Sequence, residues 1–177
     1  MDTNDEVKFN RVLDRLMRSR TVCKMKEFHQ HVGTSTFRHC ENVARYSFHL
    51  AQKFGWNIDE ESLAMGAMLH DYYLYNTDEM SCSAYTHSFN HPKAALENAL
   101  VHFDLNDKER NIILSRMWPL GPLTMPHSQE AVLVQLADKY CALREMCSES
   151  ESKQIDPNEK TPWIRMKIKS TVRKAIA

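Results

Sequence analysis

In the stretch Met68-Leu69-His70-Asp71-Tyr72-Tyr73, a histidine and an aspartate stand side by side at the end of an apolar helical run. Burying an imidazole and a carboxylate together costs free energy unless each of them has a partner. A metal ion could pair with both groups, and a core histidine hydrogen-bonded to an aspartate would explain the pair without any ion. The pattern alone favours neither interpretation over the other.

The residues around this stretch repeat their apolar positions at three- and four-residue steps, which is the period of a helix. Four glycines and six prolines in 177 residues are too few for the frequent turns of a β-sandwich or barrel. We therefore predict an all-α fold, a compact bundle of about six to eight helices. The predicted helices cover residues 5–20, 36–54, 59–70, 106–117, 128–147 and 161–177, with a further helix that starts at Asn90-His91-Pro92.

Two other residues could bind the same metal ion as the histidine and aspartate at positions 70 and 71. His39 lies near the start of its predicted helix and on the apolar stripe, while Asp138 follows the apolar run of residues 131–137. Two histidines and two aspartates would give one divalent metal a mixed nitrogen and oxygen shell. This donor set suits Mn, Fe, Co, Ni, Zn or Mg, and it leaves positions open for water and substrate.

The composition restricts the cellular setting and the kind of partner. Lysine plus arginine and aspartate plus glutamate both number 23, so a net charge of zero provides no field to gather a nucleic acid polymer or a membrane. Five cysteines, an odd number without a C-x-x-C pair, argue against a disulfide framework and a zinc ribbon. No apolar run approaches the ~20 residues of a membrane span. We expect a cytoplasmic protein of one domain that acts on a small dissolved partner.

The order of these residues is more specific than their number. His39, then His70-Asp71 some thirty residues later, then Asp138 in an Ala-Asp-Lys context on a later helix, resembles the HD-domain superfamily of metal-dependent phosphohydrolases. The resemblance spans residues 35–147, inside a helical domain of residues 1–147. Residues 148–160 are polar and are predicted to be a linker. Residues 161–177 are predicted to form a basic amphipathic helix that docks on the same domain.

The resemblance implies that His39, His70, Asp71 and Asp138 bind one divalent metal ion. It also implies hydrolysis of a nucleotide or another small phosphate ester, in which Asp71 acts on the water that the metal activates. His91 at its helix start is similar to a residue that helps to hold a second ion in the two-metal branch of the superfamily, and His87 could assist it.

Two positions depart from the pattern of the superfamily. Arg116 stands near the place where the two-metal branch has a further histidine, and its guanidinium could hold a phosphate instead of a second metal. Leu74 occupies the position where many members carry a lysine, three residues after the His-Asp pair. An alternative is therefore a module of the same fold that binds metal or nucleotide with weak or no turnover.

Overall fold

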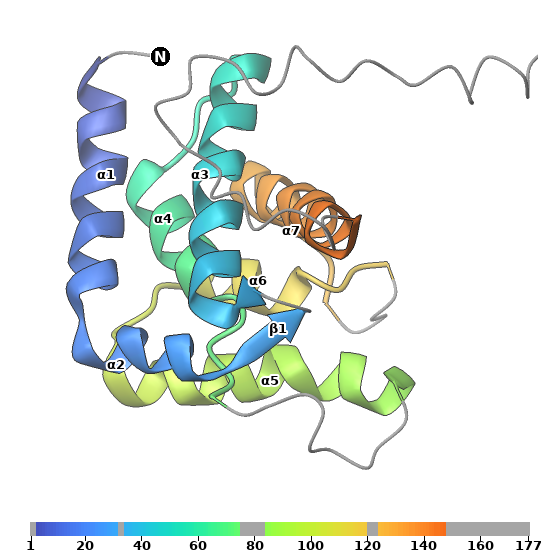
Figure 1. Cartoon of the computed structure of the whole chain (residues 1–177). Coiled ribbons are helices and arrows are strands. Elements are labelled where there is room, and N and C mark those ends of the chain that lie inside the picture. The colour runs from blue at the N-terminus through green and yellow to red at the C-terminus, as the bar shows by residue number, and fades with distance from the viewer. Residues whose placement is uncertain (1–2, 32–33, 75–83, 120–123, 148–177) are drawn as a thin grey trace, which may run out of the picture.

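The computed structural model describes residues 3–31, 34–74, 84–119 and 124–147 (Figure 1). Within these ranges the fold is all-α, as predicted, with one short antiparallel strand pair. The helices are α1 (Thr3–Arg18), α2 (Arg20–Cys23), α3 (Thr36–Phe54), α4 (Glu60–Leu69), α5 (Ala84–His102), α6 (Asp107–Ser115) and α7 (Gln129–Cys147). A 3-10 turn, η1 (Lys24–Glu27), and the strands β1 (His29–His31) and β2 (Thr34–Ser35) connect α2 to α3.

Helix α3 begins and ends where the sequence predicts. The side chain of Ser35 accepts a hydrogen bond from the backbone N–H of Arg38, which satisfies one of the free donors of the first turn. The helix ends at Gly55, whose φ of 66° lies in the left-handed region that glycine adopts without a steric penalty. These two ends fix the register of α3, and with it the position of His39.

The N-termini of α4, α6 and α7 each carry a side-chain cap. Asp59 accepts from the backbone N–H of Ser62. Asn106 forms a capping box with Glu109, and Oγ of Ser128 accepts from the backbone N–H of Ala131 at 3.2 Å. Because these caps stop the helices at defined residues, they also orient the buried side chains further along each helix.

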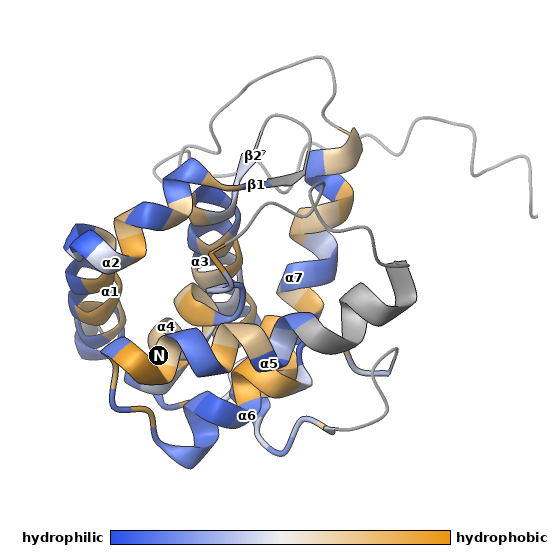
Figure 2. Cartoon of the chain, turned by 90° about the horizontal axis from the view of Figure 1, so that it is seen from below, coloured by the Kyte–Doolittle hydropathy of each residue, from blue (hydrophilic) through white to orange (hydrophobic). Residues whose placement is uncertain are grey.

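Helix α4 is the centre of the bundle and packs against α1, α3 and α6. Most of its residues are buried, and the backbone of Gly66 lies so close to α6 that a Cβ there would meet the side chain of Ile112 at 2.7 Å. Helix α7 lies beside α3 (Figure 1). In Figure 2 the long helices alternate hydrophilic and hydrophobic residues, as expected for helices with one face in the core. The central helix thus ends, at His70, inside the bundle.

One predicted boundary is wrong. Helix α5 begins at Ala84 rather than at Asn90, so Pro92 lies inside the helix and His91 is not at its N-terminus. The φ of proline fits a helix, and its missing N–H is best tolerated in the first turn. Pro92 therefore resembles a start signal although it lies inside α5. The predicted linker at 148–160 and the predicted helix at 161–177 lie outside the described residues. Among the helices of the described part, none is long and apolar enough to cross a membrane.

Candidate metal centre

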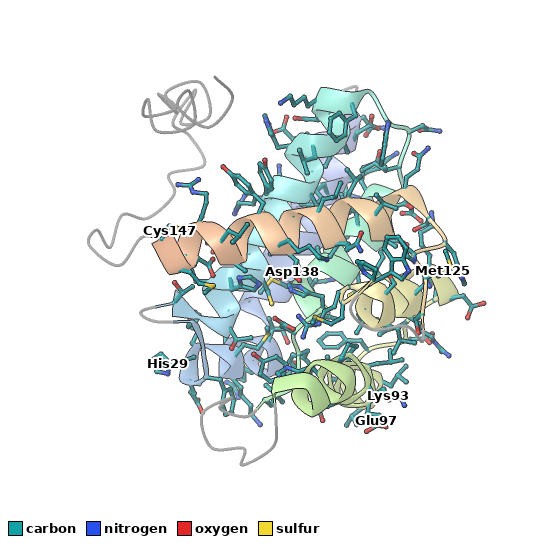
Figure 3. All side chains as sticks on the ribbon, turned by 90° about the vertical axis from the view of Figure 1, so that its right-hand side faces the viewer. His29, Lys93, Glu97, Met125, Asp138 and Cys147 are labelled. Carbon is teal, nitrogen blue, oxygen red and sulfur yellow. The ribbon has the colours of Figure 1, made fainter. Side chains whose placement is uncertain are left out.

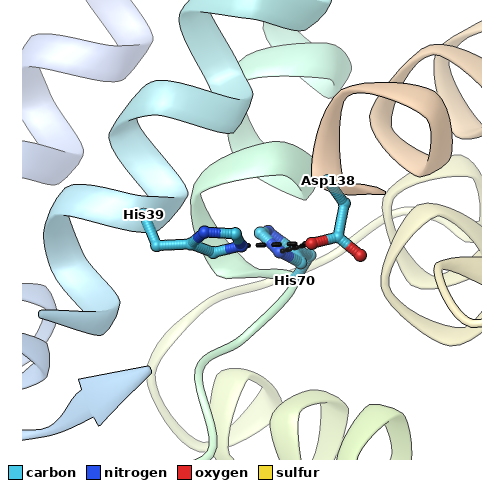
Figure 4. Close-up of side chains that lie close together, drawn as sticks. All are labelled: His39, His70 and Asp138. Carbon is cyan, nitrogen blue, oxygen red and sulfur yellow. Dashed lines mark hydrogen bonds and ion pairs between the residues drawn. The ribbon is translucent and has the colours of Figure 1, made fainter. Parts of the chain in front are cut away.

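Three of the predicted ligands converge between α3, α4 and α7 (Figure 4). His39 comes from the first turns of α3, His70 caps the end of α4, and Asp138 lies midway along α7 (Figure 3). All three are buried, and one ligand atom of each lies within 4.8 Å of the others. Nitrogen and oxygen donors at this spacing can share a metal ion.

His70 presents a nitrogen without a hydrogen-bond partner to this space. Its Nδ1 donates to the carbonyl oxygen of Ala67 at 2.7 Å, so in the neutral ring that a metal would bind the lone pair is on Nε2. Nε2 is buried and makes no hydrogen bond, while the nearest carboxylate oxygens are Oδ2 of Asp71 at 3.5 Å and Oδ1 of Asp138 at 3.6 Å. A lone pair that faces two anionic oxygens is unfavourable without a cation between them. The orphaned nitrogen therefore fits a metal ligand.

His39 lies between two carboxylates. Its Nε2 is 3.1 Å from Oδ1 of Asp138, and its Nδ1 is 2.8 Å from Oε2 of Glu145. Burial alone would lower the pKa of His39, but the hydrogen bonds to these two carboxylates outweigh burial and raise the pKa to about 10. Without a metal the ring is an imidazolium. A metal on Nε2 would replace one proton, and Glu145 would keep the other on Nδ1.

Asp71 divides its two oxygens between the histidines and an arginine. Oδ1 is 2.6 Å from Nη1 of Arg116, while Oδ2 is 3.5 Å from Nε2 of His70 and 3.9 Å from Nε2 of His39. Asp71 is fully buried and Arg116 is 5% exposed. The fourth predicted ligand, Asp71, therefore lies beside the three converging ones, and Arg116 is in contact with it. We call these five residues with Glu145 the central cluster.

The net charge of the central cluster matches the charge of one divalent cation. Burial alone would raise the pKa of Asp138, but the hydrogen bond from His39, the neighbouring ring of His70 and the charge of Arg116 hold it well below its usual range. The cluster holds three carboxylates, those of Asp71, Asp138 and Glu145, and one guanidinium. With neutral histidines the net charge is minus two, which one divalent ion cancels.

Arg116 directly follows α6, and α7 holds its backbone in place. Lys139 donates from Nζ to the carbonyl oxygens of Arg116 at 3.3 Å and Trp118 at 3.1 Å. The side-chain amide of Gln135 also donates to the carbonyl oxygen of Trp118. Lys139 thus ties the segment after α6 to α7.

Of the two histidines predicted for a second ion, the structure describes the side chain of His91. His91 is buried and packs against the ring of Tyr73, with the ring centroids 4.7 Å apart and the planes 75° apart. It does not belong to the group of close ligands found among the described residues. His87 lies in α5, at a position whose side chain is outside the described residues.

Sequence reasoning assigned no role to Glu145. The signal was its spacing, because Glu145 lies seven residues after Asp138 and so on the same side of the helix. Its partner Asn42 stands three residues after His39 and donates to Oε1 of Glu145 at 3.2 Å. A carboxylate that accepts from the outer nitrogen of a ligand histidine fixes the tautomer and orientation of that ring.

The chain matches a known protein family. A protein-family model described as HD domain matches residues 36–143, which is more than half of the chain. The matched segment contains the whole central cluster except Glu145. No curated protein and no solved structure matches the chain.

Proposed function

Because the chain belongs to the HD-domain family, whose members are generally metal-dependent hydrolases, we propose that it hydrolyses a nucleotide or another small phosphate ester. One observation carries this proposal. His70 turns a buried nitrogen without a hydrogen-bond partner toward His39, Asp71 and Asp138, a donor set that suits one divalent ion.

His39, His70 and Asp138 would hold the ion, with Asp71 beside them. When bound, the ion would lower the pKa of a coordinated water and polarise a phosphoryl oxygen. Asp71 directs Oδ2 toward the two histidines, where it can orient the attacking water and accept its proton. Arg116 keeps the other oxygen of Asp71 occupied, so this carboxylate has one orientation.

Arg116 also supports a phosphorylated substrate. Its Nε is buried and has no hydrogen-bond partner among the described residues, so the guanidinium has donor capacity beyond its contact with Asp71. Planar guanidinium groups match phosphate oxygens in charge and geometry. We propose that a phosphoryl oxygen of the substrate uses these remaining donors.

Metal analysis and a substrate screen test the proposal. Protein purified without chelator is analysed for bound metal and then assayed with nucleoside monophosphates, nucleoside triphosphates and cyclic nucleotides in the presence of Mn²⁺, Co²⁺ or Mg²⁺. We expect about one ion per chain and metal-dependent release of phosphate or opening of the cyclic ester. Absence of metal under all conditions, or turnover that Asp71→Ala leaves unchanged, contradicts the proposal.

A second candidate function is a module that binds a nucleotide without turning it over. Two observations favour it: Leu74 provides no cation at the position of the superfamily lysine, and Arg116 already neutralises Asp71. Tight binding of a nucleotide to the metal-loaded protein, without hydrolysis at any metal, would support this candidate. Turnover of a single natural nucleotide would exclude it.

A further inference from the structure

We infer that Arg116 is a built-in cation of the central cluster, which takes the place of a second metal ion and limits the cluster to one divalent ion. The inference rests on the proposed metal site at His39, His70 and Asp138. It concerns the number of ions and their affinity, so it can be tested by metal binding without any assay of activity.

The contacts of the two aspartates divide the cluster into two sides. Toward the histidines, Asp71 presents Oδ2 and Asp138 presents Oδ1. Toward Arg116, Asp71 presents Oδ1 at 2.6 Å and Asp138 presents Oδ2 at 4.0 Å. Each carboxylate thus offers one oxygen to each side. Two carboxylates that each offer an oxygen on both sides can bridge two cations. On the side away from the histidines, the cation is the guanidinium of Arg116.

Arg116 is fixed in this position. It is 5% exposed, and although burial would lower its pKa, the neighbouring Asp71 and Asp138 raise it, so the group stays charged. The bonds from Lys139 and Gln135 to backbone carbonyls of this segment tie it to α7. Because both the backbone and the guanidinium of Arg116 are held, moving this side chain out of the cluster would cost considerable free energy.

The charge balance gives the same answer independently. The three carboxylates and the one guanidinium need one divalent ion to reach neutrality, and a second ion would leave two positive charges in a buried place. Replacing the guanidinium by a neutral group of similar size removes the fixed charge and frees Oδ1 of Asp71. Either a second ion then binds, or the first ion binds more tightly.

A titration with Mn²⁺ tests the inference. Wild type, Arg116→Gln and Arg116→Lys are stripped with chelator, dialysed and titrated by calorimetry, and bound Mn²⁺ is counted by electron paramagnetic resonance. We expect one ion in wild type and in Arg116→Lys, which keeps the charge. In Arg116→Gln we expect a second ion or at least about tenfold tighter binding of the first, because a repulsive unit charge close to the site is gone.

Arg45→Gln is the matched control. Arg45 also pairs with a buried glutamate, Glu41 at 3.1 Å, but on a part of α3 outside the central cluster. We expect it to bind Mn²⁺ like wild type. This control separates the loss of any arginine–carboxylate pair from the loss of the pair in the cluster.

Every outcome of the titration decides something. The inference is overturned if wild type or Arg116→Lys binds two ions. It is also overturned if Arg116→Gln binds a single ion with unchanged or weaker affinity. In both cases the proposed function stands. No binding of Mn²⁺ by wild type contradicts the proposed metal site itself. If Arg116→Gln does not fold, the ion counts of wild type and Arg116→Lys still test the limit of one ion.

Discussion

Two polar clusters at helix junctions in the described part of the chain are built on different principles. One is the central cluster. The other, which we call the capping cluster, joins the N-terminal ends of α4, α6 and α7 and consists of Asp59, Ser62, Asn106, Lys108, Glu109 and Glu130. Both contain buried carboxylates, so burial of charge does not distinguish them.

The two clusters differ in whether protein groups satisfy them. In the capping cluster, Glu130 accepts from the backbone N–H of Asp59 at 2.7 Å and from Nζ of Lys108 at 3.1 Å. No side-chain atom of its six residues is buried without a partner, whereas the central cluster leaves Nε2 of His70 and Nε of Arg116 without hydrogen bonds. A complete network stabilises the fold alone, and an incomplete one indicates a place for a ligand.

The largest expected effect comes from matched amide substitutions in the two clusters. Asp138→Asn removes a direct ligand and should weaken Mn²⁺ binding by about a hundredfold or more, beyond the range typical of outer residues. Glu130→Gln makes the same chemical change in the capping cluster and should leave Mn²⁺ affinity unchanged. Calorimetric titration measures both variants. Equal affinities for the two would remove the distinction between the clusters.

Removal of the metal should have the next largest effect. An ion at a hundred times its dissociation constant stabilises a folded protein by about 2.7 kcal/mol. For a chain of this size that corresponds to a rise in Tm of about 5–10 °C, which a chelator should abolish. Differential scanning calorimetry with and without Mn²⁺ measures the shift. A shift of the same size in Asp138→Asn would mean that the ion binds elsewhere.

The sequence predicted the parts of the site that helical periodicity controls. His39, His70 and Asp138 were placed on inward-facing stripes, and helices with defined caps carry such stripes to a common interior. The caps at Asp59 and Asn106 are equally local, because each depends on residues only three positions apart.

Contacts between segments that lie far apart in the sequence cannot be predicted from helical periodicity. Arg116 was predicted to hold a phosphate or mark a second metal position, but its contact with Asp71 depends on how the end of α6 lies against α4 and α7, which no local period encodes. The same holds for Glu145, which reaches His39 across 106 residues of chain. The start of α5 was misplaced because Pro92 resembled an N-terminal signal.

A substitution in the capping box should lower the stability of the fold without changing metal binding. Asn106→Ala removes the acceptor of the backbone N–H of Glu109 and the donor to Oγ of Ser62. We expect the free energy of unfolding to fall by about 1 kcal/mol, measured by urea denaturation. The Mn²⁺ affinity should equal that of wild type. A weaker metal site in this variant would show that the clusters are coupled.

The smallest expected effect is a pH dependence that belongs to the capping cluster. Burial would raise the pKa of Glu130, but the hydrogen bonds from the backbone of Asp59 and from Lys108 help to lower it below the value in the unfolded chain. A lowered pKa means that this carboxylate contributes stability above the unfolded pKa, about 4.3, and that the contribution disappears as the pH falls through the folded pKa.

Glu130→Gln isolates this contribution. The difference in free energy of unfolding between wild type and Glu130→Gln should be constant above about pH 5.5 and should shrink as the pH is lowered to about 3. Glu109 has the opposite sign, because burial raises its pKa, but it is present in both proteins and cancels in the difference. Urea denaturation in chelator keeps metal binding by the central cluster out of the comparison. A difference that grows toward low pH would mean that the bonds to Glu130 do not favour its charged form, and that the capping cluster is as incompletely satisfied as the central one.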